Sequence, residues 1–151
     1  MKRTLIHNAT IVNEGRSVQG SVVIEGDRIA EILTYGKKLS VPCDETIDAT
    51  GCCLLPGIID EHVHFRDPGL THKADIFTES RAAAAGGVTS IMDMPNTNPL
   101  TTTLSALEQK FDLLNEKCIV NHSCYFGATN NNYTEFNQLD KHRVCGIKLF
   151  M

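Results

Sequence analysis

Two histidines separated by one residue are the clearest chemical feature of this chain. His62 and His64 follow the apolar run 54–59, and Arg66 comes two residues later. Because alternate side chains of a β-strand point to the same side, Asp60, His62, His64 and Arg66 are predicted to share one face. Two neutral imidazoles aimed at one point suit a divalent transition metal such as Zn²⁺. We interpret the pair as half of a metal site.

An isolated His-x-His pattern is short and common, so surface histidines on an ordinary polar strand are the alternative interpretation. The almost continuously apolar run 54–59 predicts a strand buried on both faces. Polar side chains at the carboxyl end of such a strand lie where α/β proteins keep their chemistry. The position therefore favours metal ligands.

Other polar residues stand at comparable positions. Arg66 could bind a substrate carboxylate through two hydrogen bonds, although a solvated surface arginine fits the same place. Asn96 follows the next predicted strand and could face the same edge, but Asn-Thr-Asn-Pro also suits a turn. Lys148 interrupts the apolar segment 144–151, where it must be paired, reach water, or have its pKa lowered by burial. For His122, a hydrogen-bonded core histidine and a functional one remain equal alternatives.

Composition restricts the class of protein. A 42% hydrophobic and 21% charged chain of 151 residues is globular, and a net charge of −4 gives no basic field for nucleic acid. We therefore expect a small-molecule substrate and no nucleic-acid partner. No segment approaches the ~20 apolar residues that span a bilayer, and no signal peptide is evident, which predicts a soluble cytoplasmic protein without a membrane partner. The oligomeric state stays open, a homo-oligomer included.

The six cysteines lack a Cys-x-x-Cys pair, which argues against a zinc ribbon. In a reducing cytosol, most of them are predicted to be small buried hydrophobic residues.

Residues 1–54 read as short strands and turns, with strands expected at 4–12, 21–24 and 29–33. This β layer is predicted to need further strands to form a stable sandwich. From residue 54 the pattern changes to alternating strands and helices. The expected strands are 54–59, 88–94, 118–126 and 144–151, and the expected helices are 76–85, 104–114 and 133–139.

This alternation predicts an α/β fold with a parallel sheet and right-handed crossovers. The short repeat fits either a (β/α)₈ barrel or a doubly wound sheet. A whole barrel needs ~250 residues, whereas only residues 55–151 remain here, and the chain stops inside a predicted strand. We therefore expect the amino-terminal portion of a longer enzyme, or one segment of a divided chain.

Segment 56–69, Pro-Gly-Ile-Ile-Asp-Glu-His-Val-His-Phe-Arg-Asp-Pro-Gly, together with Asp-Met-Pro-Asn-Thr at 93–97, resembles the amidohydrolase superfamily and, within it, the dihydroorotases. The first motif alone is shared with hydantoinases and allantoinases, and Arg66 with Asn96 sharpens the match. The resemblance implies that residues 1–54 are part of a flanking β-sandwich. Residues 55–151 would then be the first four βα units, the first half of a (β/α)₈ TIM-type barrel. Lys-Ala-Asp at 73–75 departs from the usual Lys-Glu-Asp, with no catalytic consequence expected.

The resemblance also implies roles for individual residues. His62 and His64 would bind metal, and Arg66 and Asn96 would hold the carboxylate of dihydroorotate. Lys148, carboxylated by CO₂, would bridge two metal ions, for which we expect Zn²⁺. Asp60 would orient a histidine ligand by contacting the histidine and not the metal, or serve a structural role.

No catalytic residue is expected within this segment. Two more histidines and a general-base aspartate are expected beyond Met151, so the 151-residue fragment alone should be inactive. The implied reaction is the reversible interconversion of L-dihydroorotate and N-carbamoyl-L-aspartate in pyrimidine biosynthesis. The alternatives are a hydantoinase, dihydropyrimidinase or allantoinase, or an inactive homologue kept as a scaffold.

Overall fold

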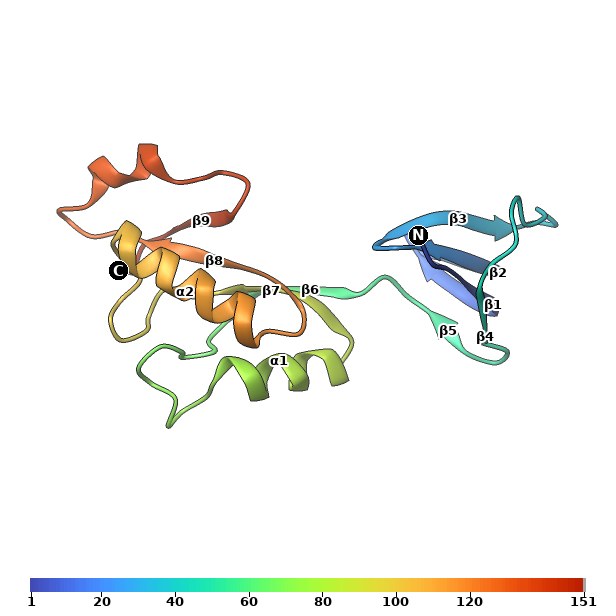
Figure 1. Cartoon of the computed structure of the whole chain (residues 1–151), viewed down its shortest axis with the longest axis horizontal. Coiled ribbons are helices and arrows are strands. Elements are labelled where there is room, and N and C mark those ends of the chain that lie inside the picture. The colour runs from blue at the N-terminus through green and yellow to red at the C-terminus, as the bar shows by residue number, and fades with distance from the viewer. Residues whose placement is uncertain (151) are drawn as a thin grey trace. The chain divides into compact units, whose positions relative to one another are not determined.

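The computed structural model describes residues 1–150, which form one compact unit over Met1–Pro56 and a second that begins at Gly57 (Figure 1). The first unit is a five-stranded sheet in the order β3-β2-β1-β4, with β5 also paired to β1. Its strands are β1 (Arg3–Asn13), β2 (Arg16–Glu25), β3 (Arg28–Thr34), β4 (Glu45–Asp48) and β5 (Cys53–Leu54). The three strands predicted here are confirmed, and each is longer than expected. The short β4 and β5 were not predicted.

The second unit contains a four-stranded sheet in the order β6-β7-β8-β9, and every neighbouring pair is parallel. Its strands are β6 (Ile58–Val63), β7 (Val88–Asp93), β8 (Asn121–Gly127) and β9 (Val144–Lys148). The connections contain α1 (Ile76–Ala85), α2 (Leu104–Lys117) and the 3₁₀ helix η1 (Tyr133–Gln138). The predicted parallel α/β arrangement is confirmed.

Both α-helices begin where the sequence predicts, because each has a capping side chain. The Asp75 carboxylate accepts a hydrogen bond from the Thr78 backbone N–H at 2.9 Å, and this bond lowers the pKa of Asp75. Thr103 caps α2 through the Ala106 N–H at 3.2 Å. The third predicted helix is a 3₁₀ helix of six residues, a short form common in connections.

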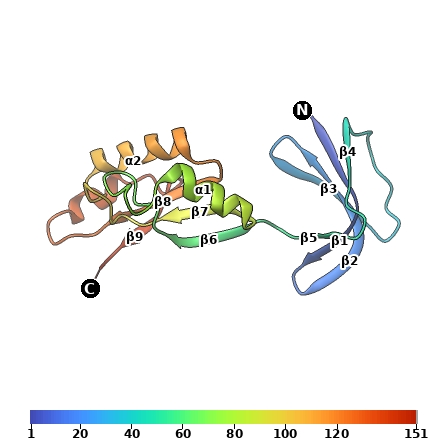
Figure 2. The same cartoon turned by 90° about the horizontal axis from the view of Figure 1, so that it is seen from below.

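Helices α1 and α2 lie on one side of the parallel sheet, where they enclose the core (Figure 2). The apolar face predicted for α2 is confirmed, since Leu107, Phe111 and Leu114 are buried there. The core cluster consists of Phe65, Ile76, Ile91, Leu107, Phe111, Leu114, Cys124 and Phe126. Residues that alternate with the core positions of a strand must face the opposite side of the sheet.

The prediction of a buried strand over residues 54–59 is wrong. Strand β6 begins at Ile58 and continues to Val63, while Leu54 belongs to β5 in the first unit. Ile58 and Ile59 are 55% and 59% exposed. The reason is that β6 is an outer strand within the described residues, with β7 as its neighbour on one side.

The prediction that most cysteines are buried is also wrong. Cys52 and Cys53 are exposed, Cys124 is buried, and the other three are intermediate. Burial raises the pKa of the Cys124 thiol to about 12, so this residue remains a neutral hydrophobic group. None of the helices in residues 1–150 is long and apolar enough to cross a membrane.

Replacement of Gly69 by alanine tests the packing next to the sheet edge. Gly69 has φ of +82°, and a Cβ there would collide with the Asn98 backbone carbonyl. Gly87, with φ of +83° and open space around it, is the matched control. In the full-length protein, Gly87→Ala should lower the free energy of unfolding by about 1–2 kcal/mol. Gly69→Ala should lower it further in urea denaturation, and equal losses would contradict the close approach.

Candidate functional site

The two histidines lie at the carboxyl end of β6, on the side of the sheet opposite the helices. Val63 packs against the core, so its strand neighbour His62 faces the other side. His64 follows the last residue of β6 and stands between Val63 and Phe65, which both belong to the core side. The centroids of the two imidazole rings are 5.2 Å apart, with a 53° angle between the ring planes. The two rings are therefore neighbours, as a shared ligand requires.

This spacing fits one metal ion. Two imidazoles bound to a tetrahedral zinc at about 2.0–2.1 Å have ring centres roughly 5 Å apart. The His64 Nδ1 lies 2.8 Å from the Asn96 Oδ1. Because an amide oxygen accepts and cannot donate, the proton of this bond resides on Nδ1, and in the neutral imidazole the lone pair is on Nε2, where a metal could bind. Within residues 1–150, no group of three or more His, Cys, Asp or Glu side chains is placed to hold a metal ion, so the metal-binding role of the pair stays a prediction.

Asn96 and Asp60 both contact the histidines, although in ways the sequence did not indicate. The bond between Asn96 and His64 brings the predicted substrate-binding amide to the predicted metal ligand. The Asp60 Oδ1 accepts a hydrogen bond from the His62 backbone N–H at 3.0 Å. Asp60 thus fixes the backbone of a histidine, and its predicted contact with an imidazole stays a prediction.

Arg66 lies in a turn and not in a continued strand. Its φ of +64° is left-handed, and β6 ends at Val63, so the strand alternation that predicted a shared face does not extend to Arg66. The following residue, Asp67, is 4% exposed, and its carboxylate accepts a hydrogen bond from the Lys117 Nζ of α2 at 2.8 Å. This ion pair ties the turn that carries Arg66 to the helix.

Lys148 lies at the same edge and on the same side of the sheet as the histidines. It pairs with Gly127, and a Cβ at Gly146 would lie 3.1 Å from the Tyr125 ring, so Gly146 and Lys148 share the Tyr125 side. Tyr125 alternates with the core residues Cys124 and Phe126 and therefore faces away from the helices. The partly buried Lys148 places its Nζ 5.4 Å from the Phe150 ring centroid. Lys148 is on β9 and His62 on β6, the two outer strands.

One pair of charged residues next to the site was missed by sequence reasoning. Asp93 and Lys110 are both 0% exposed, and the Lys110 Nζ lies 2.8 Å from the Asp93 Oδ2. The Asp93 Oδ1 accepts the Phe65 backbone N–H at 2.9 Å. A signal was present, because Lys110 falls between Leu107 and Leu114 on the apolar face of α2, where a charge needs a partner.

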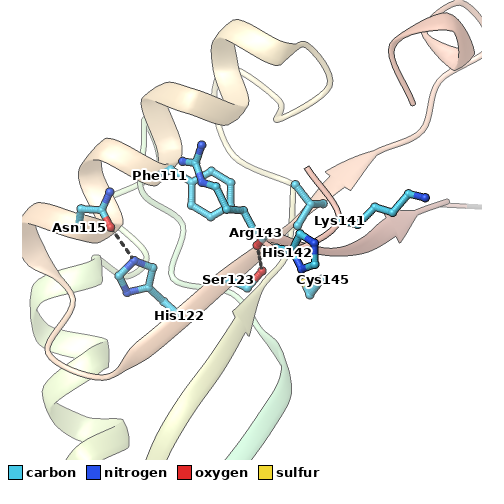
Figure 3. Close-up of a pocket in the computed structure, with 9 residues that line it drawn as sticks. Phe111, Asn115, His122, Ser123, Lys141, His142, Arg143 and Cys145 are labelled. Carbon is cyan, nitrogen blue, oxygen red and sulfur yellow. Dashed lines mark hydrogen bonds between the residues drawn. The ribbon is translucent and has the colours of Figure 1, made fainter. Parts of the chain in front are cut away.

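A hollow of about 380 Å³ lies at the opposite edge, between α2 and the amino ends of β8 and β9 (Figure 3). His122 lines it, and its ring nitrogens contact the Asn115 Oδ1 at 3.1 Å and the Val120 carbonyl oxygen at 3.2 Å. The Ser123 hydroxyl donates to the Arg143 carbonyl oxygen. These bonds favour the structural interpretation of His122.

Comparisons with known proteins agree with this arrangement. Residues 51–147 match the dihydro-orotase-like family. A dihydroorotase from Lactobacillus acidophilus is 39% identical over 133 residues, covering 88% of this chain and 30% of that protein. An allantoinase from Deinococcus radiodurans is 34% identical over 148 residues, covering 97% of this chain and 32% of that protein. The structure of L-hydantoinase (dihydropyrimidinase) from Arthrobacter aurescens matches with a TM-score of 0.88 at 29% identity, covering 97% of this chain and 32% of that one.

A parallel half-barrel sheet in one unit and a separate sheet in the other resemble amidohydrolase amino-terminal regions, and this combination defines the class of this protein. Within that class, the chain belongs to the dihydroorotase-like family. It spans about a third of the length of the curated relatives that it matches.

The ion pair that ties the Arg66 turn to α2 gives a pH-dependent prediction. In the full-length protein, Lys117→Met leaves the Asp67 carboxylate unpaired and should lower the free energy of unfolding at pH 7 by about 1–3 kcal/mol. The hydrogen bond to Asp67 raises the pKa of Lys117 above its usual 10.5. The stabilisation is therefore complete below pH 10.5 and is lost as the pH rises through the raised pKa.

Urea denaturation of the unsubstituted and Lys117→Met proteins should accordingly give converging stabilities in strongly alkaline solution. Lys141→Met, which removes an exposed lysine, is the control and should change little at either pH. A difference between Lys117→Met and the unsubstituted protein that stays constant with pH would contradict this role.

Proposed function

We propose that this chain is the amino-terminal portion of a cytoplasmic, metal-dependent cyclic amide hydrolase. The proposed reaction is the reversible interconversion of L-dihydroorotate and N-carbamoyl-L-aspartate, a step of pyrimidine biosynthesis. Residues 1–54 would belong to a flanking β-sandwich, and residues 55–151 would be the first four βα units of a (β/α)₈ barrel. The observation that carries this proposal is the 5.2 Å separation of the His62 and His64 rings, with Asn96 bonded to His64 and Arg66 two residues farther along the chain.

In this proposal, His62 and His64 bind metal, together with Lys148 as a carbamate, and the site takes two Zn²⁺ ions. When bound, such ions polarise a carbonyl group and activate water. The chain's own contribution is orientation. Asn96 holds the His64 Nδ1 proton, so the Nε2 lone pair stays available, and Asp60 fixes the His62 backbone.

Arg66 and Asn96 would hold the substrate by its carboxylate, the Asn96 Nδ2 acting as a donor while its Oδ1 serves His64. A guanidinium and an amide at one edge fix both the position and the plane of a carboxylate. This orientation presents the cyclic amide to water. Oxygen from water bonds to the carbonyl carbon, the ring C–N bond breaks, and the leaving nitrogen gains a proton. The proton-transferring aspartate is proposed to lie beyond Met151.

A hydantoinase-type activity is the second candidate, because solved hydantoinase structures match this chain. The substrates of the two classes differ in the carboxylate on the ring, which makes Arg66 the deciding residue. The third candidate, an inactive scaffold, differs from both in lacking metal and turnover.

Replacement of Arg66 by alanine in the full-length enzyme should separate the two substrate classes. Loss of charge-assisted hydrogen bonds to the carboxylate should raise KM for dihydroorotate by about 10- to 100-fold. Dihydrouracil, which lacks the carboxylate, is the matched control substrate, and its KM should stay within a few-fold. Steady-state assays of dihydroorotate, dihydrouracil and allantoin provide the measurement. A preference for dihydrouracil in the unsubstituted enzyme would favour the hydantoinase instead.

Metal analysis tests the proposed role of Lys148. The full-length enzyme should contain two metal ions per site and lose turnover on chelation, with recovery when Zn²⁺ is returned. Lys148→Ala should reduce the metal content. Lys141→Ala, which removes an exposed lysine that precedes β9, is the control and should leave the metal content unchanged. Intact mass should reveal one added CO₂ in the unsubstituted protein. Unmodified lysine with full activity would exclude the carbamate, and absence of both metal and turnover would favour the scaffold.

A further inference from the structure

We infer that the buried Asp93–Lys110 pair positions the His64–Arg66 segment, and that both are positioning residues for the site. The inference rests on the proposed function, because it assigns the pair a role toward the metal ligand His64. Asp93 ends β7 and Lys110 lies on α2, and neither side chain touches solvent. The Lys110 Nζ lies 2.8 Å from the Asp93 Oδ2 and donates to the Met94 carbonyl oxygen at 2.6 Å.

Val63 and Phe65, the neighbours of His64, form backbone hydrogen bonds to Met94 and Asp93. Lys110 contacts both of those residues. The Phe65 backbone N–H donates to the Asp93 Oδ1 at 2.9 Å. The Met94 backbone N–H donates to the Val63 carbonyl oxygen at 2.9 Å. The backbone of His64 is therefore anchored before and after the residue, while its ring is held separately by Asn96. Helix α2 is thus linked to the backbone around His64 through Lys110, Asp93 and Met94.

Electrostatics explains why a charged pair indicates positioning here. A buried ion pair costs so much desolvation that apolar residues of the same volume are often equally stabilising. A packed apolar pair, however, could not accept the Phe65 N–H or fix the Met94 carbonyl. One carboxylate oxygen accepts the Phe65 amide, and the other lies within ion-pair distance of the Lys110 Nζ, whose hydrogen bond goes to the Met94 carbonyl. Stability alone leaves this directional arrangement unexplained.

Two double variants of the full-length protein isolate the contact with Phe65. Both remove the two charges, so neither leaves a buried charge unpaired. Asp93→Asn with Lys110→Met keeps an oxygen that can accept the Phe65 N–H, whereas Asp93→Leu with Lys110→Met removes it. The leucine variant should bind Zn²⁺ about 10- to 100-fold more weakly than the asparagine variant, the size typical of losing a group that orients a metal ligand.

The same comparison separates positioning from stability. Zn²⁺ affinity is measured by competition with a chromophoric chelator, and folding by circular dichroism at the same temperature. Glu108→Gln, which removes the exposed α2 pair with Arg143, is the control and should leave Zn²⁺ affinity unchanged. Equal Zn²⁺ affinity and equal KM in two folded double variants would overturn the inference.

If the leucine variant does not fold, hydrogen exchange of the Phe65 amide in the unsubstituted full-length protein tests the inference instead. The Phe65 amide should be strongly protected in the metal-free protein, because its acceptor is buried protein and not metal. Exchange at the rate of an open loop would overturn the inference. Protection of Phe65 in a protein that neither binds Zn²⁺ nor turns over dihydroorotate would instead leave the anchor intact and refute the proposed function.

Discussion

The burial of one ammonium and one carboxylate group beneath α2 is the constraint on which this sheet edge depends. A charge that is fully removed from water must be satisfied by fixed partners, and here those partners are backbone groups of the segment that carries His64. Core packing and site geometry are therefore not separable in this unit. The helix that covers the core also holds Asp67, beside Arg66, through Lys117. A displacement of α2 would therefore shift the backbone around both His64 and Arg66.

The two sides of the parallel sheet carry different kinds of side chain. One side carries the apolar alternates of each strand under α1 and α2, and the other carries Tyr125, Lys148 and the histidines. The carboxyl ends of the strands lie at one edge, so side chains from strands far apart in sequence are directed to a common region. Because His62 and Lys148 occupy the two outer strands, curvature of the sheet determines how near they come.

Local signals in the sequence predicted the two α-helices well. Helix α1 is bounded by Asp75 and by consecutive glycines, and the spacing of Leu107, Phe111 and Leu114 shows which face of α2 is buried. Both signals act within a few residues, where propensity and capping dominate. The meeting of Asn96 with His64 depended on parallel pairing of two strands, which alternation of elements also predicted.

Features set by distant contacts escaped prediction. The apolar composition of residues 54–59 indicated burial, but burial depends on which strands lie alongside. The left-handed backbone of Arg66 is fixed by the turn around it, and arginine has no preference for that conformation. The place of Lys110 on the apolar face of α2 signalled that it needs a partner, but its partner Asp93 is known only from the packing of α2 on the sheet.

The exposed isoleucines of β6 have a consequence for how such a protein reaches its native state. An outer strand with uncovered apolar side chains and free backbone groups is a template for any extended segment that it meets. The same holds at β9, where Ile147 is 47% exposed. During folding, these uncovered strand edges would favour association with other extended segments, so escape from aggregation depends on how quickly the edges are covered.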